Sequence, residues 1–161
     1  MTRLRTSVLN AVVKTSYLIL IITILMLVAY STSCATDNGR CGDYASLIDN
    51  LRKAGAVVEE KGEVASNLLS AKCMVISVND SNVDVWEYDN AASASAQAAL
   101  ISLDGSSIQT GMKITLVEWI GSSHFYKAGK LIVLYVGESE AVTVVLERVL
   151  GPPFAGSFAG W

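Results

Sequence analysis

The sequence predicts an α+β fold, in which two β-hairpins form an antiparallel sheet and helices pack mainly on one face of it. Residues 73–78 and 83–88 are rich in β-branched and aromatic side chains, and four turn-forming residues separate them. A second pair of β-rich segments follows at 113–120 and 131–136. Between them, residues 125–126 enter a further element, and residues 127–130 form a tight bend. Each pair precedes a segment with helical character, which gives the order ββα-ββα.

An apolar segment at the N-terminus predicts a signal or anchor helix ahead of this fold. The only charged residues before position 37 are basic, and residues 17–30 are apolar except for Thr23. Fourteen residues span about 21 Å as a helix, which suits a signal peptide better than a full crossing of a bilayer core of about 30 Å. Because flanking basic residues stay cytoplasmic, we expect the domain on the extracytoplasmic side of the cell membrane.

Cys34 is the candidate lipidation site. It follows Ser31-Thr32-Ser33 at the end of the apolar segment, an arrangement that resembles the bacterial lipobox, in which the cysteine carries the lipid. That pattern has an aliphatic residue three places before the cysteine, where this chain has Ser31. Lipidation of Cys34, an uncleaved anchor and secretion after ordinary cleavage are the three alternatives.

The first helix of the domain is expected to begin after Asp43, an N-cap residue, and to end at Gly55. Apolar side chains recur at helical spacing between these two residues, at Tyr44, Leu47, Ile48 and Leu51. A short strand is expected at 56–59. Residues 60–70 form either an extended segment or a single turn.

The first hairpin has side chains that alternate between two faces. Val83 and Val85 point one way, and Asp84 and Trp86 point the other way. Neither face is wholly apolar, so we expect a sheet that is packed on one side only.

A helix rich in alanine and serine is expected after the first hairpin, capped by Asp89 or Asn90 and continuing through Leu103. Such small side chains let a helix lie close to a sheet. Residues 104–107 are expected to form a turn, and residues 113–120 a strand.

The most apolar strand is expected at 131–136, and its continuous apolarity predicts a central strand covered on both faces. A helix follows at 138–150. Acidic side chains in its first turn and Arg148 in its last turn are favourable to the helix dipole. Residues 151–153, Gly-Pro-Pro, end this helix.

Length and composition set the domain organisation. The chain has 161 residues, enough for one domain, and 52% of them are apolar, which excludes a disordered polymer. Its net charge of -3 argues against nucleic-acid binding, which usually needs a basic surface. We divide the chain into a signal peptide or membrane anchor at 1–34, a linker at 35–42, a single α+β domain at 43–156 and a C-terminal tail at 157–161.

Few residues are available for catalysis. His124 is the only histidine, and Ser122 and Ser123 precede it. Adjacent residues on an extended chain point opposite ways, and the chain has no Gly-x-Ser-x-Gly motif. We therefore expect no catalytic residue, no cofactor and no metal site, with a hydrolase that uses His124 and a nearby serine as the alternative.

Cys41 and Cys73 remain if Cys34 carries a lipid. In an oxidising compartment they either form a disulfide or stay as thiols, Cys73 in the core and Cys41 in the linker. Both alternatives are open.

Three segments resemble a group of small, uncharacterised bacterial proteins that follow a lipoprotein-type or anchor segment. These segments are residues 104–108 (DGSSI), 124–137 (HFYKAGKLIVLYVG) and 149–156 (VLGPPFAG). The resemblance implies a bacterial origin, an extracytoplasmic location and one compact domain. It carries no functional residue over to this chain.

These observations together predict a membrane-tethered extracytoplasmic module that binds a small molecule or a protein without catalysing a reaction. Its contact with the membrane is expected through the N-terminal segment alone. The alternatives are the hydrolase described above and a structural accessory subunit of an envelope complex.

Overall fold

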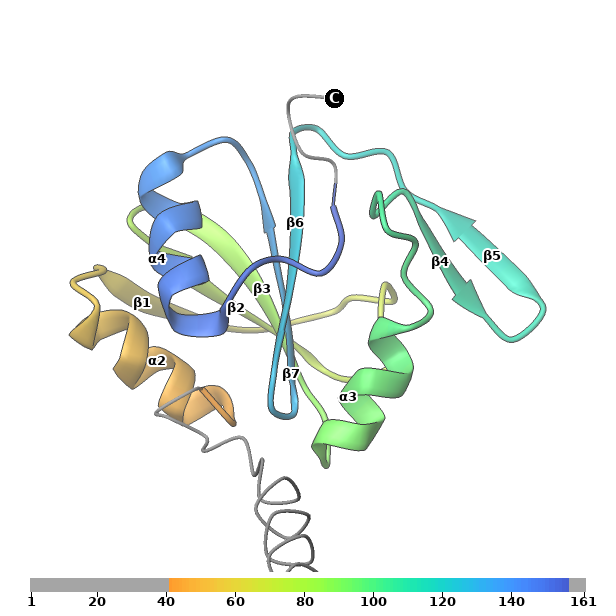
Figure 1. Ribbon diagram of the computed structural model, residues 1–161, viewed down its shortest axis with the longest axis horizontal. Coiled ribbons are helices and arrows are strands. Elements are labelled where there is room, and N and C mark those ends of the chain that lie inside the picture. Colours follow the sequence, from red (N-terminus) through yellow and green to blue (C-terminus); the bar gives the residue numbers. More distant parts are fainter. Residues whose placement is uncertain (1–40, 157–161) are drawn as a thin grey trace, which may run out of the picture. The chain divides into compact units, whose positions relative to one another are not determined.

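The computed structural model describes residues 41–156, which form an α+β domain (Figure 1). The signal or anchor segment predicted at 1–34, most of the linker and the tail at 157–161 lie outside the described residues. The elements are α2 (Tyr44–Lys53), β1 (Val58–Val64), β2 (Cys73–Val78), β3 (Ser81–Glu87), α3 (Ala91–Ala98), β4 (Ser107–Thr110), β5 (Lys113–Leu116), β6 (Ser123–Ala128), β7 (Leu131–Val136) and α4 (Glu140–Leu150).

Five strands form the main sheet in the order β1-β2-β3-β7-β6, and all neighbours are antiparallel. The hairpins β2–β3 and β6–β7 meet through β3 and β7, with Val85 opposite Val133. The antiparallel sheet and the central position of residues 131–136 are therefore confirmed. Strand β1 extends to Val64, so the first part of the 60–70 segment is extended.

Both faces of the sheet are covered, contrary to the expectation of packing on one side only. Helices α2 and α4 pack with Leu131 and Val133 in one core cluster. Helix α3 packs with Ile132 and Leu134 in a second cluster on the other face. In Figure 1, α4 and α3 accordingly lie on opposite sides of the β6–β7 hairpin. Two of the three described helices share a face, so the predicted placement of the helices holds only in part.

Local signals at the ends of α2 agree with its predicted limits. The Asp43 side chain accepts a hydrogen bond from the backbone N–H of Ser46, and the Ser46 hydroxyl accepts one from the N–H of Asp43. At the other end Gly55 has φ 92, and its N–H donates to the carbonyl of Arg52. The N–H of Ala56 donates to the carbonyl of Leu51, which completes a Schellman motif.

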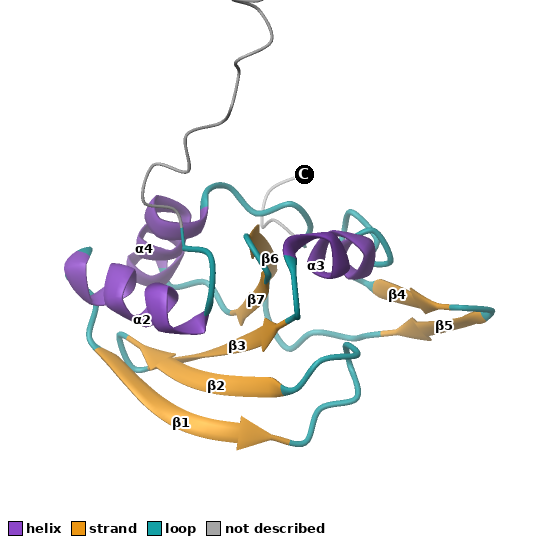
Figure 2. Cartoon of the chain, turned by 90° about the horizontal axis from the view of Figure 1, so that it is seen from below, coloured by secondary structure: helices purple, strands orange, loops and turns teal. Residues whose placement is uncertain are grey.

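The turn expected at 104–107 is present, because residues 103–106 turn the chain and the N–H of Gly105 donates to the carbonyl of Ser102. Strand β5 covers only the first half of the strand expected at 113–120, and it pairs with β4 in a small ribbon, β4–β5, that the prediction did not include. Gly111 is the first of its two turn residues and has φ 61, as a type II′ hairpin turn requires. The ribbon is a separate two-stranded sheet that projects from the domain beside α3 (Figure 2). The second hairpin of the main sheet is β6–β7, which turns at Gly129 and Lys130 within the bend expected at 127–130. Residues 113–116 pair with β4 instead.

Helix α3 is also shorter than predicted. Asn90 caps it by accepting a hydrogen bond from the N–H of Ser93, but the helix ends at Ala98 instead of Leu103. The next residues turn to meet the ribbon, because the carbonyl of Leu100 accepts a hydrogen bond from the N–H of Gln109.

Candidate functional site

Exposed apolar side chains gather on and beside the β4–β5 ribbon. Five of the eight large hydrophobic side chains that are exposed among the described residues lie between positions 103 and 120. They are Leu103, Met112, Ile114, Leu116 and Ile120. Monomeric soluble proteins rarely expose large contiguous apolar patches unless these take part in binding. The ribbon is therefore the strongest candidate for a contact surface in the described part of the chain.

The register of the ribbon shows why these side chains stay in solvent. Ile108 lies opposite Thr115, and Ile108 is buried in the core that covers the second face of the sheet. The flanking positions on β5, Ile114 and Leu116, must point the other way because side chains alternate along a strand. They are 62% and 78% exposed respectively. The outer face of the ribbon is therefore apolar along β5.

The base of the ribbon is held firmly. The indole N–H of Trp119 donates to the carbonyl of Gly105 at 2.8 Å, and the ring meets Phe125 edge-on at 5.9 Å. The N–H of Val117 donates to the carbonyl of Ser106. The contact surface is thus placed by the core of the domain and not by a free loop.

The outer edge of β5 is unpaired within the described residues. On the other edge of the ribbon, β4 is bonded to the segment before it, since Gln109 donates to Leu100 and Ser102 donates to Ser107. Strand β5 pairs with β4 alone. Its outward backbone groups are therefore available to another strand.

The two edges of the main sheet are protected. Strand β1 carries charged side chains at four of its seven positions, Glu59, Glu60, Lys61 and Glu63, and is irregular next to Gly62. Strand β6 is covered by the C-terminal segment, because the N–H of Phe125 donates to the carbonyl of Ala155 and the N–H of Phe154 donates back to the carbonyl of Phe125. Charge, bulges and covering segments are the usual protection of sheet edges.

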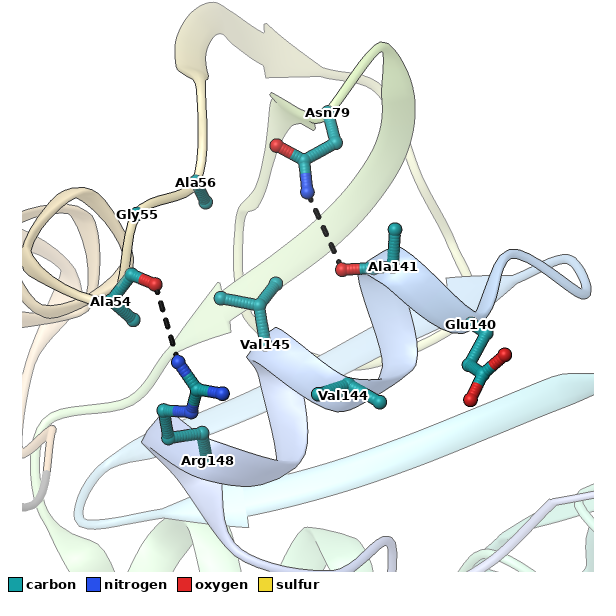
Figure 3. Close-up of a pocket in the computed structure, with 9 residues that line it drawn as sticks. All are labelled: Ala54, Gly55, Ala56, Asn79, Glu140, Ala141, Val144, Val145 and Arg148. Atoms are coloured by element: carbon teal, nitrogen blue, oxygen red, sulfur yellow. Dashed lines mark hydrogen bonds between the residues drawn. The ribbon is translucent and has the colours of Figure 1, made fainter.

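A shallow groove of about 470 Å³ lies between the end of α2, the β2–β3 turn and α4 (Figure 3). The Arg148 guanidinium donates to the carbonyl of Ala54 at 3.4 Å, and the Asn79 amide donates to the carbonyl of Ala141 at 3.3 Å. These bonds connect the walls of the groove, so its polar side chains serve the packing of α4. Arg148 keeps further donors with which it can bind a carboxylate.

Ser123 and His124 of the hydrolase alternative point to opposite faces of β6. The His124 ring stacks on Tyr135 at 5.8 Å, and its Nε2 lies 3.2 Å from the carbonyl of Gly137. Ser123 is fully buried on the opposite face, where a Cβ on Gly105 would lie 2.9 Å from its hydroxyl. The carbonyl of Ser122 accepts a hydrogen bond from the N–H of Gly137.

Cys41 and Cys73 are both free thiols and are each 1% exposed. Cys41 belongs to the core cluster with α2 and α4, whereas Cys73 belongs to the cluster on the other face of the sheet. Burial raises the pKa of Cys41 to about 12 and that of Cys73 to about 11. The disulfide alternative is thus not realised in the structure, because the sheet separates the two thiols. Cys34 lies outside the described residues.

Comparisons of this chain with protein-family models, with characterised proteins and with solved structures gave no match. Among residues 41–156, no group of three or more His, Cys, Asp or Glu side chains is placed to hold a metal ion. No helix in that same range is long and apolar enough to cross a bilayer.

The sequence carried a signal for the hairpin turn of the ribbon that the prediction did not use. Gly111 stands at the first turn position, directly before the alternating residues 113–116 from which the strand was predicted. A glycine at the first position of a two-residue turn, next to a segment of alternating polar and apolar residues, is typical of a tight hairpin.

Proposed function

We propose that this chain is a membrane-tethered, extracytoplasmic binding domain that docks on a protein through the β4–β5 ribbon. The observation that carries the proposal is the exposure of Ile114 and Leu116 on a ribbon that is fixed to the core at its base. Aliphatic side chains gain free energy when a partner removes them from water.

The charge of the chain favours a protein partner over a lipid surface. From Cys34 onward there are nine Lys and Arg residues against fifteen Asp and Glu residues, a balance of -6. Anionic headgroups repel such a domain, and peripheral membrane binding usually needs a basic cluster. Attachment to the membrane is therefore assigned to the N-terminal segment, as a lipid on Cys34 or as the uncleaved apolar helix.

Site-specific photocrosslinking tests this function. A photoreactive amino acid is placed at Leu116 in the full chain, and a matched control carries it at Asp49, an exposed position on α2. After illumination of intact membranes, we expect adducts from position 116 and none from position 49. Equal yields at both positions, or no adduct at position 116, would contradict the proposal.

For an adduct with a different protein, its yield also separates a transient binder from the alternative of a structural accessory subunit. A constitutive subunit gives one adduct in constant proportion to the chain, whatever the growth condition. A binding module gives an adduct whose yield follows the abundance of its partner.

A further inference from the structure

We infer that the partner at β5 is a second copy of this chain, and that two β5 strands pair antiparallel about a two-fold axis at Thr115. The inference depends on the proposed function, because it names the protein that docks on the ribbon. It would join two ribbons into one four-stranded sheet.

The first argument is the state of the sheet edges. Within residues 41–156, β1 is protected by charge, β6 is covered by Phe154 and Ala155, and the outer edge of β4 is bonded to residues 100–102. Strand β5 is the edge that none of these devices protects. Its single charged residue, Lys113, stands at the end next to the turn. An unprotected apolar edge is a template for a further strand.

The second argument is the hydrogen-bond register. The N–H of Val117 donates to Ser106 on the β4 side, and Thr115 lies opposite Ile108. Bonded positions alternate along an antiparallel pair, so Thr115 and Val117 bond to β4 while the backbone groups of Ile114 and Leu116 point outward. A two-fold axis at Thr115 places Ile114 opposite Leu116 of the second copy, and Leu116 opposite its Ile114. Every outward N–H and C=O of these two residues then meets a partner.

The third argument is side-chain complementarity in the same register. Ile114 and Leu116 lie on one face of the ribbon, so both cross-strand pairs are aliphatic, and such pairs stabilise a sheet. Lys113 lies opposite Val117 of the second copy, so no like charges face each other. A two-stranded ribbon is marginal by itself, and four strands make a more stable sheet.

The symmetry explains why the open edge does not lead to fibres. Pairing about a two-fold axis uses the same surface on both copies and leaves no open β5 edge in the dimer. Copies tethered in one membrane also meet at a high effective concentration, which favours a small interface.

A cysteine at the axis tests the pairing. Thr115 would face Thr115 of the second copy as a non-hydrogen-bonded pair, with Cα atoms about 4.5 Å apart, which is within the range of a disulfide. The full chain with Thr115→Cys is oxidised in native membranes and analysed on a non-reducing gel. The matched control is Thr110→Cys, an exposed position on β4. In the proposed dimer the two Thr110 residues would lie about 20 Å apart, three strand spacings across the sheet and four residues along it.

We expect a species of twice the chain mass from Thr115→Cys that is absent from Thr110→Cys and from the parent chain. Equal crosslinking of both variants, or a Thr115→Cys chain that stays monomeric, would overturn the inference. If Leu116 still photocrosslinks to another protein in that case, the proposed function survives and only the second copy is excluded. If both experiments fail, both proposals fail.

Discussion

At the scale of single residues, Gly156 has the least room for a side chain among the glycines of the described residues. Its N–H donates to the carbonyl of Leu103, and a Cβ on it would overlap the carbonyl oxygen of Ser123. Its φ of 145 is in a range that other residues rarely adopt. We expect Gly156→Ala to lower the free energy of unfolding by about 3 kcal/mol, through overpacking and backbone strain together.

Gly62 provides the matched control for this substitution. It also has a positive φ, of 99, but nothing lies within 4 Å of its Cβ position. Gly62→Ala should therefore cost about 1 kcal/mol from backbone strain alone. Urea denaturation of both variants measures the difference. Equal losses would show that the contact with Ser123 carries no energy.

A second prediction at this scale concerns Asp104. Its carboxylate accepts hydrogen bonds from the hydroxyls of Ser102 and Ser106 and from the N–H of Ser106, which hold its pKa at about 2, below the usual 3.8. A lowered pKa in the folded state means that the charged form stabilises the fold at neutral pH. That contribution is lost as the pH falls from about 4 to about 2.

The variant Asp104→Asn removes the charge and keeps one acceptor oxygen. We expect it to be less stable than the parent at pH 6, and the difference should shrink steadily between pH 4 and pH 2. Urea denaturation across this pH range gives the measurement. A gap that does not change with pH would assign the effect to geometry and not to charge.

At the scale of elements, the limits of α2 could be predicted because their causes are local. The Asp43–Ser46 cap and the left-handed Gly55 lie within one turn of the helix ends. Strand β4 could not be predicted in this way, because three of its four residues are polar and it forms by docking Ile108 into the core. Tertiary contact here outweighs weak local preference.

The same reasoning applies to the candidate contact surface. The alternation of polar and apolar residues in β5 showed that Ile114 and Leu116 share a face. This alternation does not show which face of the strand the rest of the domain covers. Only the position of Ile108 beneath the ribbon shows that the face of Ile114 and Leu116 is the open one.

A prediction about the ribbon follows from this exposure. The double variant Ile114→Thr with Leu116→Thr should change the free energy of unfolding by less than about 0.5 kcal/mol, because both side chains are already in water. Ile108→Thr, the control on the buried face, should cost about 2 kcal/mol through a lost contact and a buried hydroxyl. Urea denaturation in dilute solution compares them. A large loss in the double variant would mean that Ile114 and Leu116 support the fold itself.

At the scale of the whole molecule, the composition and the order of the predicted elements along the chain were sufficient to predict the α+β class and a central strand at 131–136. They were not sufficient to predict that both faces of the main sheet are covered. Trp86 and Asp84 share a face of β3, and the polar Asp84 suggested that this face was open. In the structure α3 and the segment around Ile108 cover this face. Burial also raises the pKa of Asp84, because a charged carboxylate is less stable away from water.

The last prediction concerns attachment of the whole chain to the membrane. The domain has an excess of six acidic over basic residues from Cys34 onward, so it should not bind a bilayer by itself. Attachment is then a property of residues 1–34. We expect the mature chain to begin at Cys34 with a diacylglyceryl group on the thiol, and to leave the membrane in detergent but not in high salt.

Mass spectrometry of the mature N-terminus measures this directly. Cys34→Ser should leave an unprocessed chain that keeps residues 1–33, because the residue that accepts the lipid is missing. Ser31→Leu, which supplies the aliphatic residue three places before the cysteine, should speed the processing without changing its product. An intact N-terminus in the parent chain would indicate an uncleaved anchor. A lipid-free start near Thr32 or Thr36 would indicate a secreted protein, and the tether on which the proposed function depends would then be absent.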